Sequence, residues 1–479
     1  MNGRHESDDL DRYLKWRLER WRLDRRQLLK GAAAAALGGV AASLAGAADA
    51  DAAPFEAEEE ENVKQSPAQG QTLDVFLANH TSFYAFVGPE FERKYNAKIN
   101  WTREQFGLIP SKLTPAFQAG GHTWDVAYMW RAWVEQYREF LTPLTDIGYT
   151  PPANVRSDWL PVALKQVQAL NGRIYGLPSN VYTYVLYGNR KRLAQAGVAQ
   201  LPDNYADFKA LAKELTGRGL FGYTDGWAPL YLFPKYCVWL HLNGGRLYSK
   251  GNVGDVLFDT PQAMQATQDM IELYPYMPKE SITSPWGIYD LEAKKVFFSG
   301  KAAMIIDYQH IWYEAQDPSQ SRIGKGNIVV ALVPGSKKGG PRSGGQYVGE
   351  CFVIPKTSEK KAAALELIKF FSNAKTQLGL LTRRVGLEKF DSADESGFPS
   401  YKSDYTNPTV PLKDTPIIRT TFAQQKYPGF RYETRPAYQP IADTIEAAVS
   451  AALNKQKSVE AAHKEAQKAL DKIVAEEKL

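Results

Sequence analysis

The sequence predicts an α/β protein of two domains, and three observations lead to that prediction. Apolar strand patterns alternate with helical patterns along most of the chain, which is the order of a mainly parallel sheet covered by helices. The chain has 479 residues, more than one hydrophobic core normally serves. It contains two cysteines, which excludes a disulfide scaffold as the source of stability.

The regular pattern begins at Thr72. In TLDVFLAN the apolar residues alternate as in a half-buried strand, and Thr81 or Ser82 can then cap a helix that runs to Tyr95. A second strand is expected around Ile99, followed by a helix over 109–119. Mostly apolar runs, typical of buried strands, follow at 125–130, 185–189, 302–308, 328–334 and 350–355.

Helices are expected between these strands. Thr260 and Pro261 provide a cap and a first-turn proline for QAMQATQDMIELY. Two apolar stripes of helical period lie near the carboxyl terminus. We expect both stripes to belong to the hydrophobic core rather than to an interaction surface. The stripes are Ile441, Ile445, Val449 and Leu453, and then Val459, Ala462, Ala466, Leu470 and Ile473.

The amino-terminal stretch DRRQLLKGAAAAALGGVAASLAGAADADA allows three interpretations: a membrane span, a buried helix or an export signal. Residues 31–48 are mainly Ala and Gly, too weakly apolar to favour a span of ~30 Å of hydrocarbon. Arg25 and Arg26 precede the run, and small-x-small patterns end it. We therefore predict a cleaved twin-arginine signal over 1–52, export by the twin-arginine translocase to the periplasm, and a flexible acidic leader over 53–71.

The sequence lacks the motifs and composition that several classes of protein function require. The formal net charge of +5 is small for this length and argues against a nucleic-acid partner. The six histidines show no metal-ligand spacing, and phosphate loops and nucleophile elbows are absent from the sequence. Cys237 and Cys351 are either a disulfide pair or two buried free thiols. We expect no metal, no cofactor and no catalytic residue.

A series of phrases in a fixed order resembles family 1 extracellular solute-binding proteins, the maltose-binding-protein-like receptors of ABC importers. The resemblance spans nearly all of the chain after residue 72. Its phrases are DVAYMWRAWVEQYREFLTPLTDIG, GRIYGLPSNVYTYVLYGNRKRLAQAGV, LPDNYADFKALAKEL, FDTPQAMQATQDMIELYP, VFFSGKAAMIID, VALVPG, SGGQYVGECFVIPKTSEKKAAALELIKFFSNAKTQ and RPAYQPIADTIEAAVSAAL.

This resemblance implies a periplasmic-binding-protein-like fold, in which two α/β lobes are joined by three hinge crossovers and close on a ligand. The crossovers would lie near 177–181, 305–307 and 348–352. Lobe 1 would comprise 72–178 plus 308–348, and lobe 2 would comprise 180–304 plus 352–479. The resemblance also implies a monomer that captures a carbohydrate or sugar alcohol and delivers it to membrane permease subunits.

Ligands of open α/β sheets bind beyond the carboxyl ends of strands, so residues that follow the expected strands are candidates. For the candidates in the first lobe, a structural role competes with ligand binding as the explanation. Thr81 and Ser82 are candidate caps as well, Glu104 and Gln105 can simply be solvated, and Trp133 can be core. The first-lobe candidates retained for ligand binding are Asn79, His80, Glu104, Trp130 and Arg131.

The second lobe and the crossovers supply the remaining candidates. Any one of the aromatic residues can be core instead of a ring that stacks on a sugar. These candidates are Asn180, Tyr182, Trp227, Trp286, Asp307, Gln346 and Tyr347, with Tyr289 and Tyr308 beside them.

Alternatives to a neutral sugar remain open at this point. Arg383 and Arg384 would suit a phosphorylated or acidic ligand, although surface solvation is the commonest explanation of such a pair. An exported carbohydrate-active enzyme would need an acid and base from Glu104, Asp290 and Asp307. A ferric or polyamine receptor is a further alternative, because tyrosine and carboxylate are plentiful.

Replacing both Arg25 and Arg26 with lysine should stop export and leave ligand binding by the cytoplasmic product unchanged. The twin-arginine translocase recognises the arginine pair of the signal, whereas ligand binding depends on the folded domain. Cell fractionation and calorimetry measure the two outcomes separately. Normal periplasmic accumulation of the variant would show that this segment does not use the twin-arginine route.

Overall fold

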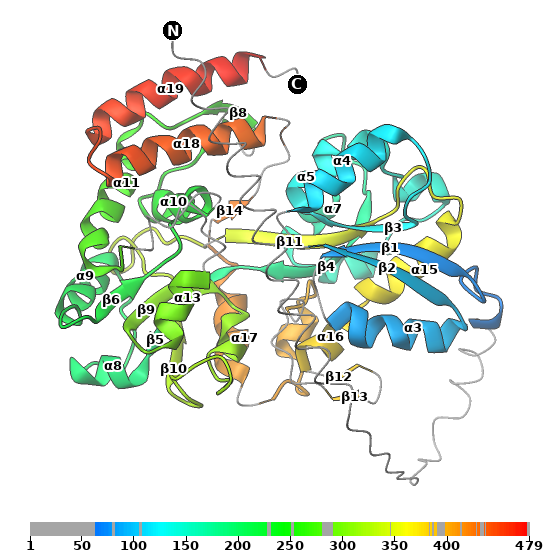
Figure 1. The fold of residues 1–479 in the computed structure, drawn as a ribbon, viewed down its shortest axis with the longest axis horizontal. Coiled ribbons are helices and arrows are strands. Elements are labelled where there is room, and N and C mark those ends of the chain that lie inside the picture. Colours follow the sequence, from blue (N-terminus) through cyan, green and yellow to red (C-terminus); the bar gives the residue numbers. More distant parts are fainter. Residues whose placement is uncertain are drawn as a thin grey trace, which may run out of the picture. The chain divides into compact units, whose positions relative to one another are not determined.

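A computed structural model describes most of the chain after residue 62 (Figure 1). The predicted signal, with Arg25 and Arg26, lies outside the described residues. Within them, no helix combines the length and apolar character needed to cross a membrane. The described ranges are 63–78, 82–104, 108–227, 231–250, 253–279, 291–344, 346–382, 384–385, 388–389, 398–411, 414–427, 429–431, 435 and 437–476.

The first lobe is built on a six-stranded sheet. Its main path has the order β14-β11-β3-β1-β2, and β4 also pairs with β11. β1, β2 and β3 run parallel, and β11 runs antiparallel to both β3 and β4. The strands are β1 (Thr72–Ala78), β2 (Lys98–Glu104), β3 (Val126–Trp130), β4 (Gly176–Tyr182), β11 (Gln346–Val353) and β14 (Phe430–Arg431).

Helices pack on this sheet through an aromatic core. The ring of Phe352 in β11 lies 5.0 Å from the rings of both Phe83 and Phe371. Such burial of large rings is the main favourable term in packing a helix on a sheet. The helices are η1 (Phe83–Val87), α3 (Gly88–Tyr95), α4 (Ile109–Ala119), α5 (Arg131–Gln136), α6 (Ala153–Asp158), α7 (Pro161–Val167), α15 (Lys361–Ser372) and α16 (Ala374–Thr382).

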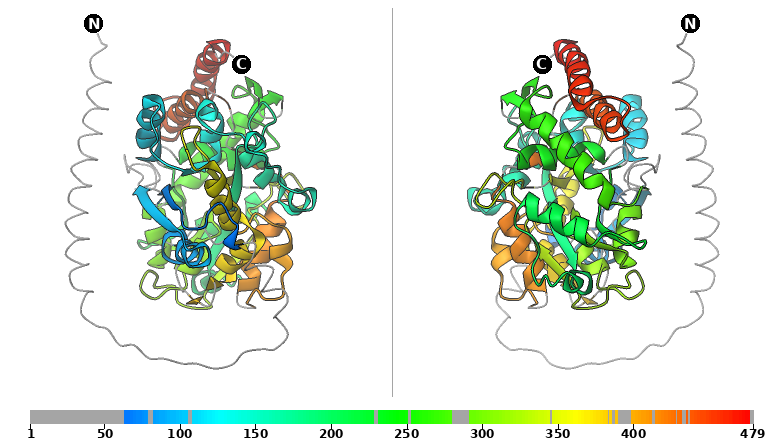
Figure 2. Two further views of the ribbon diagram at one scale, coloured as in Figure 1. Left: turned by 90° about the vertical axis from the view of Figure 1, so that its right-hand side faces the viewer. Right: turned by 90° about the vertical axis from the view of Figure 1, so that its left-hand side faces the viewer.

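The second lobe is built on a four-stranded sheet of order β10-β5-β9-β6, and the right-hand view of Figure 2 has the side of the molecule that carries this lobe toward the viewer. Its strands are β5 (Tyr184–Asn189), β6 (Phe221–Thr224), β9 (Ala302–Tyr308) and β10 (Ile328–Ala331). Its helices are α8 (Arg190–Gln195), α9 (Tyr205–Glu214), α10 (Leu232–Leu242), α11 (Pro261–Leu273), α13 (Leu291–Phe298), α14 (Ile311–Glu314), α17 (Thr415–Gln424), α18 (Tyr438–Leu453) and α19 (Val459–Glu476). β7 (Tyr248–Lys250) and β8 (Val253–Val256) form a hairpin on this lobe, whereas the hairpin of β12 (Arg384–Val385) and β13 (Glu388–Lys389) contacts α16.

The chain passes between the two sheets at a buried, hydrogen-bonded crossing. Thr183 separates β4 of the first sheet from β5 of the second, and the return to β11 runs through Gly344. Thr183 Oγ1 donates to the carbonyl of Gly344 over 2.9 Å. The amide of Gln309 accepts from Thr183 N–H at 2.8 Å and donates to the carbonyl of Val181 at 2.7 Å. These four residues therefore tie both passages to the end of β9.

A third passage lies between α16 and α17. Gln377 of α16 donates to the carbonyl of Pro178 in β4 over 2.8 Å, which places α16 with the first lobe. α17 packs against β5 and β10 of the second lobe. The described residues thus contain three passages between the main parts of the lobes, and the short β14, which follows α17 and pairs with β11 of the first sheet, returns to that sheet before α18. The passage at Thr183 lies within a few residues of the crossover predicted near 177–181.

Two features of the predicted lobe organisation are wrong. β9 lies in the second sheet along its whole length, and the chain then returns to that sheet as β10, so no crossover occurs at 305–307. Residues 328–331 therefore belong to the second lobe. α15 packs on β4 and β11, so the chain after 352 begins in the first lobe. Periodicity identifies a strand or helix but does not specify its distant partner.

Two local predictions are also corrected. The predicted flexible leader over 53–71 extends too far, because Ala68 is buried and the Gly70 N–H donates to the Tyr95 carbonyl over 3.1 Å. Ser82 makes no side-chain capping bond to the π-helical turn that follows it, and the alternative cap, Thr81, lies outside the described residues. The other predicted strands and helices are confirmed, including the Thr260 cap, which accepts from the Ala263 N–H.

The carboxyl-terminal stripes are core, as expected, because their large residues pack against the hydrophobic core of the second lobe. Leu453 and Leu470 are fully or almost fully buried, whereas Val459 and Ile473 lie half-buried against the core. Of the two alternatives for the cysteines, the structure has free thiols, both of them buried.

Candidate functional site

The candidate site lies at the carboxyl ends of the parallel strands, next to the crossing between the lobes. β4 runs in the same direction as β3, because both pair antiparallel with β11. In the second sheet β6 runs parallel to β9. The relevant strand ends are Trp130, Tyr182, Thr224 and Tyr308, where ligands of open α/β sheets bind.

A buried polar row crosses the first sheet at this edge. Glu350 of β11 lies in register with Trp130 of β3 on one side and with Asn180 of β4 on the other. Asn180 Nδ2 donates to Glu350 Oε2 over 2.6 Å, and the Glu350 N–H donates to Asn180 Oδ1 over 3.2 Å. Because both residues are buried, these bonds offset the cost of removing the carboxylate from water.

Aromatic rings from both lobes meet beside this row. The ring of Tyr182 in the first sheet lies 5.6 Å from the ring of Tyr308 in the second, and Tyr308 lies 4.5 Å from Tyr184. Trp130, which is half-buried, meets Tyr438 of α18 edge-on at 6.3 Å. Trp130 and Tyr308, both half-buried, therefore give this edge flat apolar faces with polar ring edges, and the buried rings of Tyr182 and Tyr184 pack against Tyr308.

A buried ion pair shapes the turn after β6. Lys235 Nζ of α10 lies 2.6 Å from Asp225 Oδ1, and each side chain is 1% exposed. The same carboxylate accepts from Trp227 Nε1 over 3.0 Å and from the Tyr223 hydroxyl. Burial and the neighbouring Asp225 charge raise the pKa of Tyr223 well above its usual value. Tyr184 adds a ring face 4.0 Å from Lys235 Nζ.

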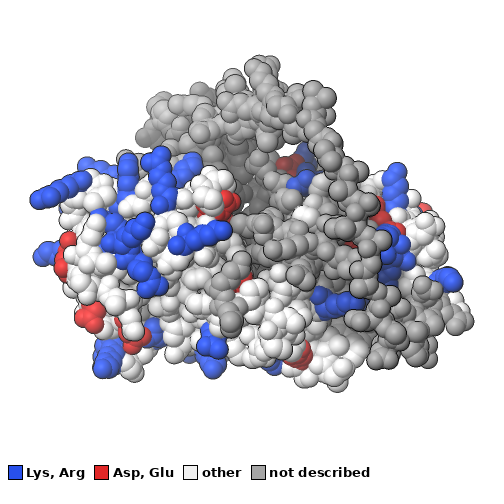
Figure 3. Space-filling view, turned by 90° about the horizontal axis from the view of Figure 1, so that it is seen from below, with Lys and Arg blue, Asp and Glu red and all other residues white. Residues whose placement is uncertain are grey.

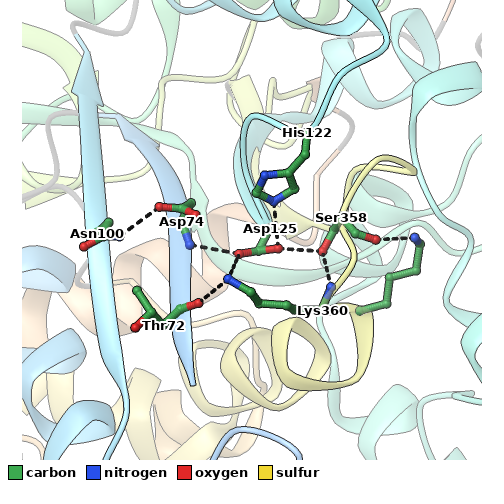
Figure 4. Close-up of polar contacts among 8 residues, drawn as sticks. Thr72, Asp74, Asn100, His122, Asp125, Ser358 and Lys360 are labelled. Carbon is green, nitrogen blue, oxygen red and sulfur yellow. Dashed lines mark hydrogen bonds and ion pairs between the residues drawn. The ribbon is translucent and has the colours of Figure 1, made fainter. Parts of the chain in front are cut away.

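A separate polar cluster lies at the amino end of β3, centred on Asp125 (Figure 4). Donor atoms of Asp74, His122 and Asp125 lie within 4.8 Å of one another, a spacing that a metal ion could use. Asp125, however, already accepts hydrogen bonds from the Asp74 N–H at 3.0 Å and from Ser358 Oγ at 2.8 Å. Its carboxylate also lies 3.6 Å from Lys360 Nζ.

The charge of Asp125 is therefore balanced by the chain itself. Burial opposes ionisation, yet the hydrogen bonds from Asp74, Ser358 and His122 and the charge of Lys360 outweigh it and lower the pKa of Asp125. Lys360 Nζ also donates to the Thr72 carbonyl over 2.6 Å. The cluster ties β1 and β3 to the start of α15 and stands at the opposite edge of the sheet from the candidate site.

Comparison with known proteins identifies the family. The model of the family described as bacterial extracellular solute-binding protein matches residues 77–378, which is more than half of the chain. The chain belongs to this family. A related protein, the arabinooligosaccharide-binding protein of Bacillus subtilis, is 26% identical over 324 residues, which cover 64% of this chain and 70% of the relative.

Solved structures agree with this assignment at the level of the fold. Maltose-bound MalE3 of T. maritima has a TM-score of 0.68 at 22% identity, covering 84% of this chain and 100% of that one. A solute-binding protein of Agrobacterium radiobacter K84 in complex with ribitol has a TM-score of 0.69 at 22% identity, covering 85% and 100%. The solute-binding protein therefore has the predicted two-lobed α/β fold.

The structure of this solute-binding protein gathers four of the predicted site residues at one place. Trp130, Asn180 and Tyr182 lie at or next to strand ends beside the crossing, and Arg131 follows directly as the first residue of α5. Arg131 is buried, and its charge acts on the thiol of Cys351. Burial and Glu350 raise the pKa of that thiol, and Arg131 opposes them.

Two predicted site residues, Trp227 and Asp307, have structural surroundings instead, and a third, Glu104, lies apart from the other candidates at the edge of the sheet. Trp227 is 1% exposed with its indole N–H bonded to Asp225, so the turn after β6 holds it as core. Asp307 is fully buried, and its carboxylate accepts from the Tyr308 N–H over 2.7 Å. Glu104 ends β2, the edge strand of the sheet, about 10 Å from β3 at the usual strand spacing.

The remaining predicted residues cannot be placed. Asn79, His80 and Trp286 lie outside the described residues, as do Thr81, Gln105, Tyr289 and Arg383. For Gln346 and Tyr347 the structure describes the backbone, which opens β11 and pairs with β14.

Sequence reasoning missed three residues of the site: Glu350, Tyr184 and Tyr438. Glu350 could have been noticed as the one carboxylate in the otherwise apolar run ECFVIP. Tyr438 gives no such signal, because its place beside Trp130 depends on packing between α18 and a strand more than 300 positions earlier.

The buried pair of Asp225 and Lys235 should be structural, so Lys235→Met should destabilise the protein without a direct effect on ligand contact. Removing the ammonium leaves an uncompensated buried carboxylate, which costs about 3 to 5 kcal/mol of unfolding free energy. Urea denaturation measures this cost. Lys112→Met, at an exposed position of α4, serves as the matched control with an effect below about 0.5 kcal/mol.

The double variant Asp225→Asn with Lys235→Met tests the cause. It should recover most of the lost stability, because both charges are then gone. A double variant as unstable as the sum of the two single variants would show that the two side chains do not act as a pair.

Proposed function

We propose that this solute-binding protein captures a carbohydrate or sugar alcohol between its two lobes and delivers it to the membrane permease subunits of an ABC importer. The single observation that carries the proposal is the meeting of aromatic rings from both lobes beside the buried Asn180–Glu350 row. Arabinooligosaccharide, maltose and ribitol in the names of similar proteins support it.

The chemistry of the site suits polyhydroxyl ligands. A sugar presents a CH-rich face that stacks on a flat ring, and hydroxyl groups that donate to and accept from amides and phenols. Trp130, Tyr182 and Tyr308 supply rings. The buried amide of Asn180 bonds Glu350 and donates to the Tyr182 hydroxyl over 3.3 Å, which holds that ring in place. Because these side chains come from both lobes, a ligand that touches all of them favours the arrangement in which the lobes are close.

A non-catalytic role is favoured over a carbohydrate-active enzyme. A glycosidase needs two available carboxyl groups roughly 5 to 9.5 Å apart across its substrate. Three of the described carboxylates near the strand ends serve the fold, and Glu104 lies apart from them on the edge strand β2. Glu350 binds Asn180, Asp225 binds Lys235, and Asp307 binds the Tyr308 amide.

Location outside the cytoplasmic membrane forms part of the same proposal. The family is described as extracellular, and the twin-arginine pattern with its small-residue exit supports export followed by cleavage. We propose that the exported protein is a monomer.

Calorimetric titration should detect binding to at least one member of a panel of arabinose oligosaccharides, maltose, ribitol, mannitol and glycerol phosphate. An affinity near 1 µM would correspond to about −8 kcal/mol. Trp130→Ala should weaken binding at least ~30-fold, because truncating an aromatic anchor costs about 2 kcal/mol or more.

Trp133→Ala is the matched control, since Trp133 follows on α5 and is 7% exposed. It should lower the thermal stability of the ligand-free protein by far more than Trp130→Ala does. The absence of binding across the whole panel would contradict the proposed ligand class. Tight binding of glycerol phosphate alone would assign the site to a phosphorylated ligand.

A further inference from the structure

The second sheet has another edge, at the end opposite the candidate site. β9 and β6 begin there at Ala302 and Phe221, and these two residues are in register. β5 ends there at Asn189, which is in register with Ile328, the first residue of β10. With strands of about 3.3 Å per residue, β9 separates the two edges by about 20 Å.

Exposed basic side chains gather in the segments that flank these strand ends. Arg190 and Lys191 directly follow β5, and Lys301 directly precedes β9. Arg218 lies in the turn before β6, and Arg322 and Lys325 lie in the turns before β10. We call this set the basic edge: Arg190, Lys191, Arg218, Lys301, Arg322 and Lys325, all of them exposed.

Backbone contacts hold the segments of the basic edge together. Arg190 Nε donates to the Gly326 carbonyl over 3.3 Å, and the Arg190 N–H donates to the Asn327 carbonyl over 2.7 Å. The carbonyl of Lys301 accepts from the Phe221 N–H over 2.9 Å. The N–H of Arg322 donates to the Phe298 carbonyl over 2.8 Å. The charges therefore share one surface and are not scattered over the lobe.

The basic edge is not neutralised by the protein itself. Within the described part of the chain, none of its six residues forms an ion pair with a carboxylate. Asp317 is close enough for Lys325 to help lower its pKa, but its oxygens accept from Ser319 and Gln320. In the view from below (Figure 3), Lys and Arg outnumber Asp and Glu on the left part of the surface, with some acidic side chains among them.

The chemistry of the basic edge fits a lipid surface better than a protein partner. Stable protein interfaces have a buried centre with aromatic or aliphatic anchors, and lysine is depleted there. The large apolar side chains exposed in the described residues are Tyr84 and Leu170, and neither belongs to this edge. A surface with charge and no anchor matches diffuse attraction to anionic headgroups, where each Lys or Arg contributes about 1 kcal/mol.

We propose that the basic edge holds this protein peripherally on a membrane surface that carries anionic phospholipid headgroups. The contact would be electrostatic, reversible and without insertion. Because the candidate solute site lies at the other end of the same strands, about 20 Å away, it stays open to solvent. That separation exceeds the screening length of about 8 Å at physiological salt, so lipid binding and solute binding are independent.

The test uses the full chain with vesicles of phosphatidylglycerol and phosphatidylcholine, and with vesicles of phosphatidylcholine alone. Co-sedimentation at about 0.1 M salt should detect binding to the anionic vesicles alone, and about 0.5 M salt should abolish it. The variant Lys191→Glu, Arg218→Glu, Lys301→Glu and Lys325→Glu should lower partitioning at least about tenfold.

A matched control has the same charge change on the first lobe: Lys98→Glu, Lys112→Glu, Lys356→Glu and Lys375→Glu, all at exposed positions. It should bind vesicles far better than the basic-edge variant. A second readout is acetylation of lysines by an amine-reactive reagent, followed by mass spectrometry. Anionic vesicles should protect Lys191, Lys301 and Lys325, and should leave Lys98 and Lys112 reactive.

Several results would overturn the proposal. Equal loss of binding by both four-residue variants would show that total charge, and not this edge, is responsible. Binding to phosphatidylcholine alone, or unprotected lysines on the basic edge, would also contradict it. Retention that required permease subunits in the vesicles would assign the edge to a protein partner instead.

Discussion

The crossing at Thr183 is the constraint on which the rest of the structure depends. One buried amide, that of Gln309, accepts from the Thr183 N–H and donates to the Val181 carbonyl, while the Thr183 hydroxyl bonds Gly344. The Tyr187 hydroxyl adds a bond to the Gln309 carbonyl at 2.9 Å. Because unsatisfied buried polar groups cost about 1 to 3 kcal/mol each, these bonds specify where the two sheets meet.

The candidate site is a consequence of that meeting point. Tyr182 and Tyr184 flank Thr183 and belong to different sheets, so a two-residue step in sequence places one ring on each lobe. Tyr308 is fixed next to Gln309 for the same reason. The supporting polar groups are satisfied locally, Glu350 by Asn180 and Asp225 by Lys235, which leaves the half-buried rings of Trp130 and Tyr308 as the accessible part of this edge.

The sequence was sufficient for elements whose signal is local. Strand alternation at 72–78 and the Thr260 cap before Pro261 are examples, since each depends on neighbours along the chain. The sequence was insufficient for contacts between residues that lie far apart along the chain. Nothing in IVVA indicates that β10 pairs with β5, and nothing around Trp227 indicates that Asp225 and Lys235 hold it inside. An aromatic ring packs in a hydrophobic core and stacks on a ligand by the same chemistry. A tryptophan that follows a strand in the sequence therefore does not show which of these two roles it has.

The distance between the lobes, measured with and without bound sugar, tests capture between the lobes most directly. Spin labels at Lys112→Cys in α4 and Glu214→Cys in α9 mark exposed positions on the two lobes, while Cys237 and Cys351 are buried and should not react. Saturating the site with the sugar found by calorimetry should shift the spin–spin distance distribution, because a ligand that contacts both lobes favours the arrangement in which they are close. An identical distribution with and without saturating sugar would contradict capture between the lobes.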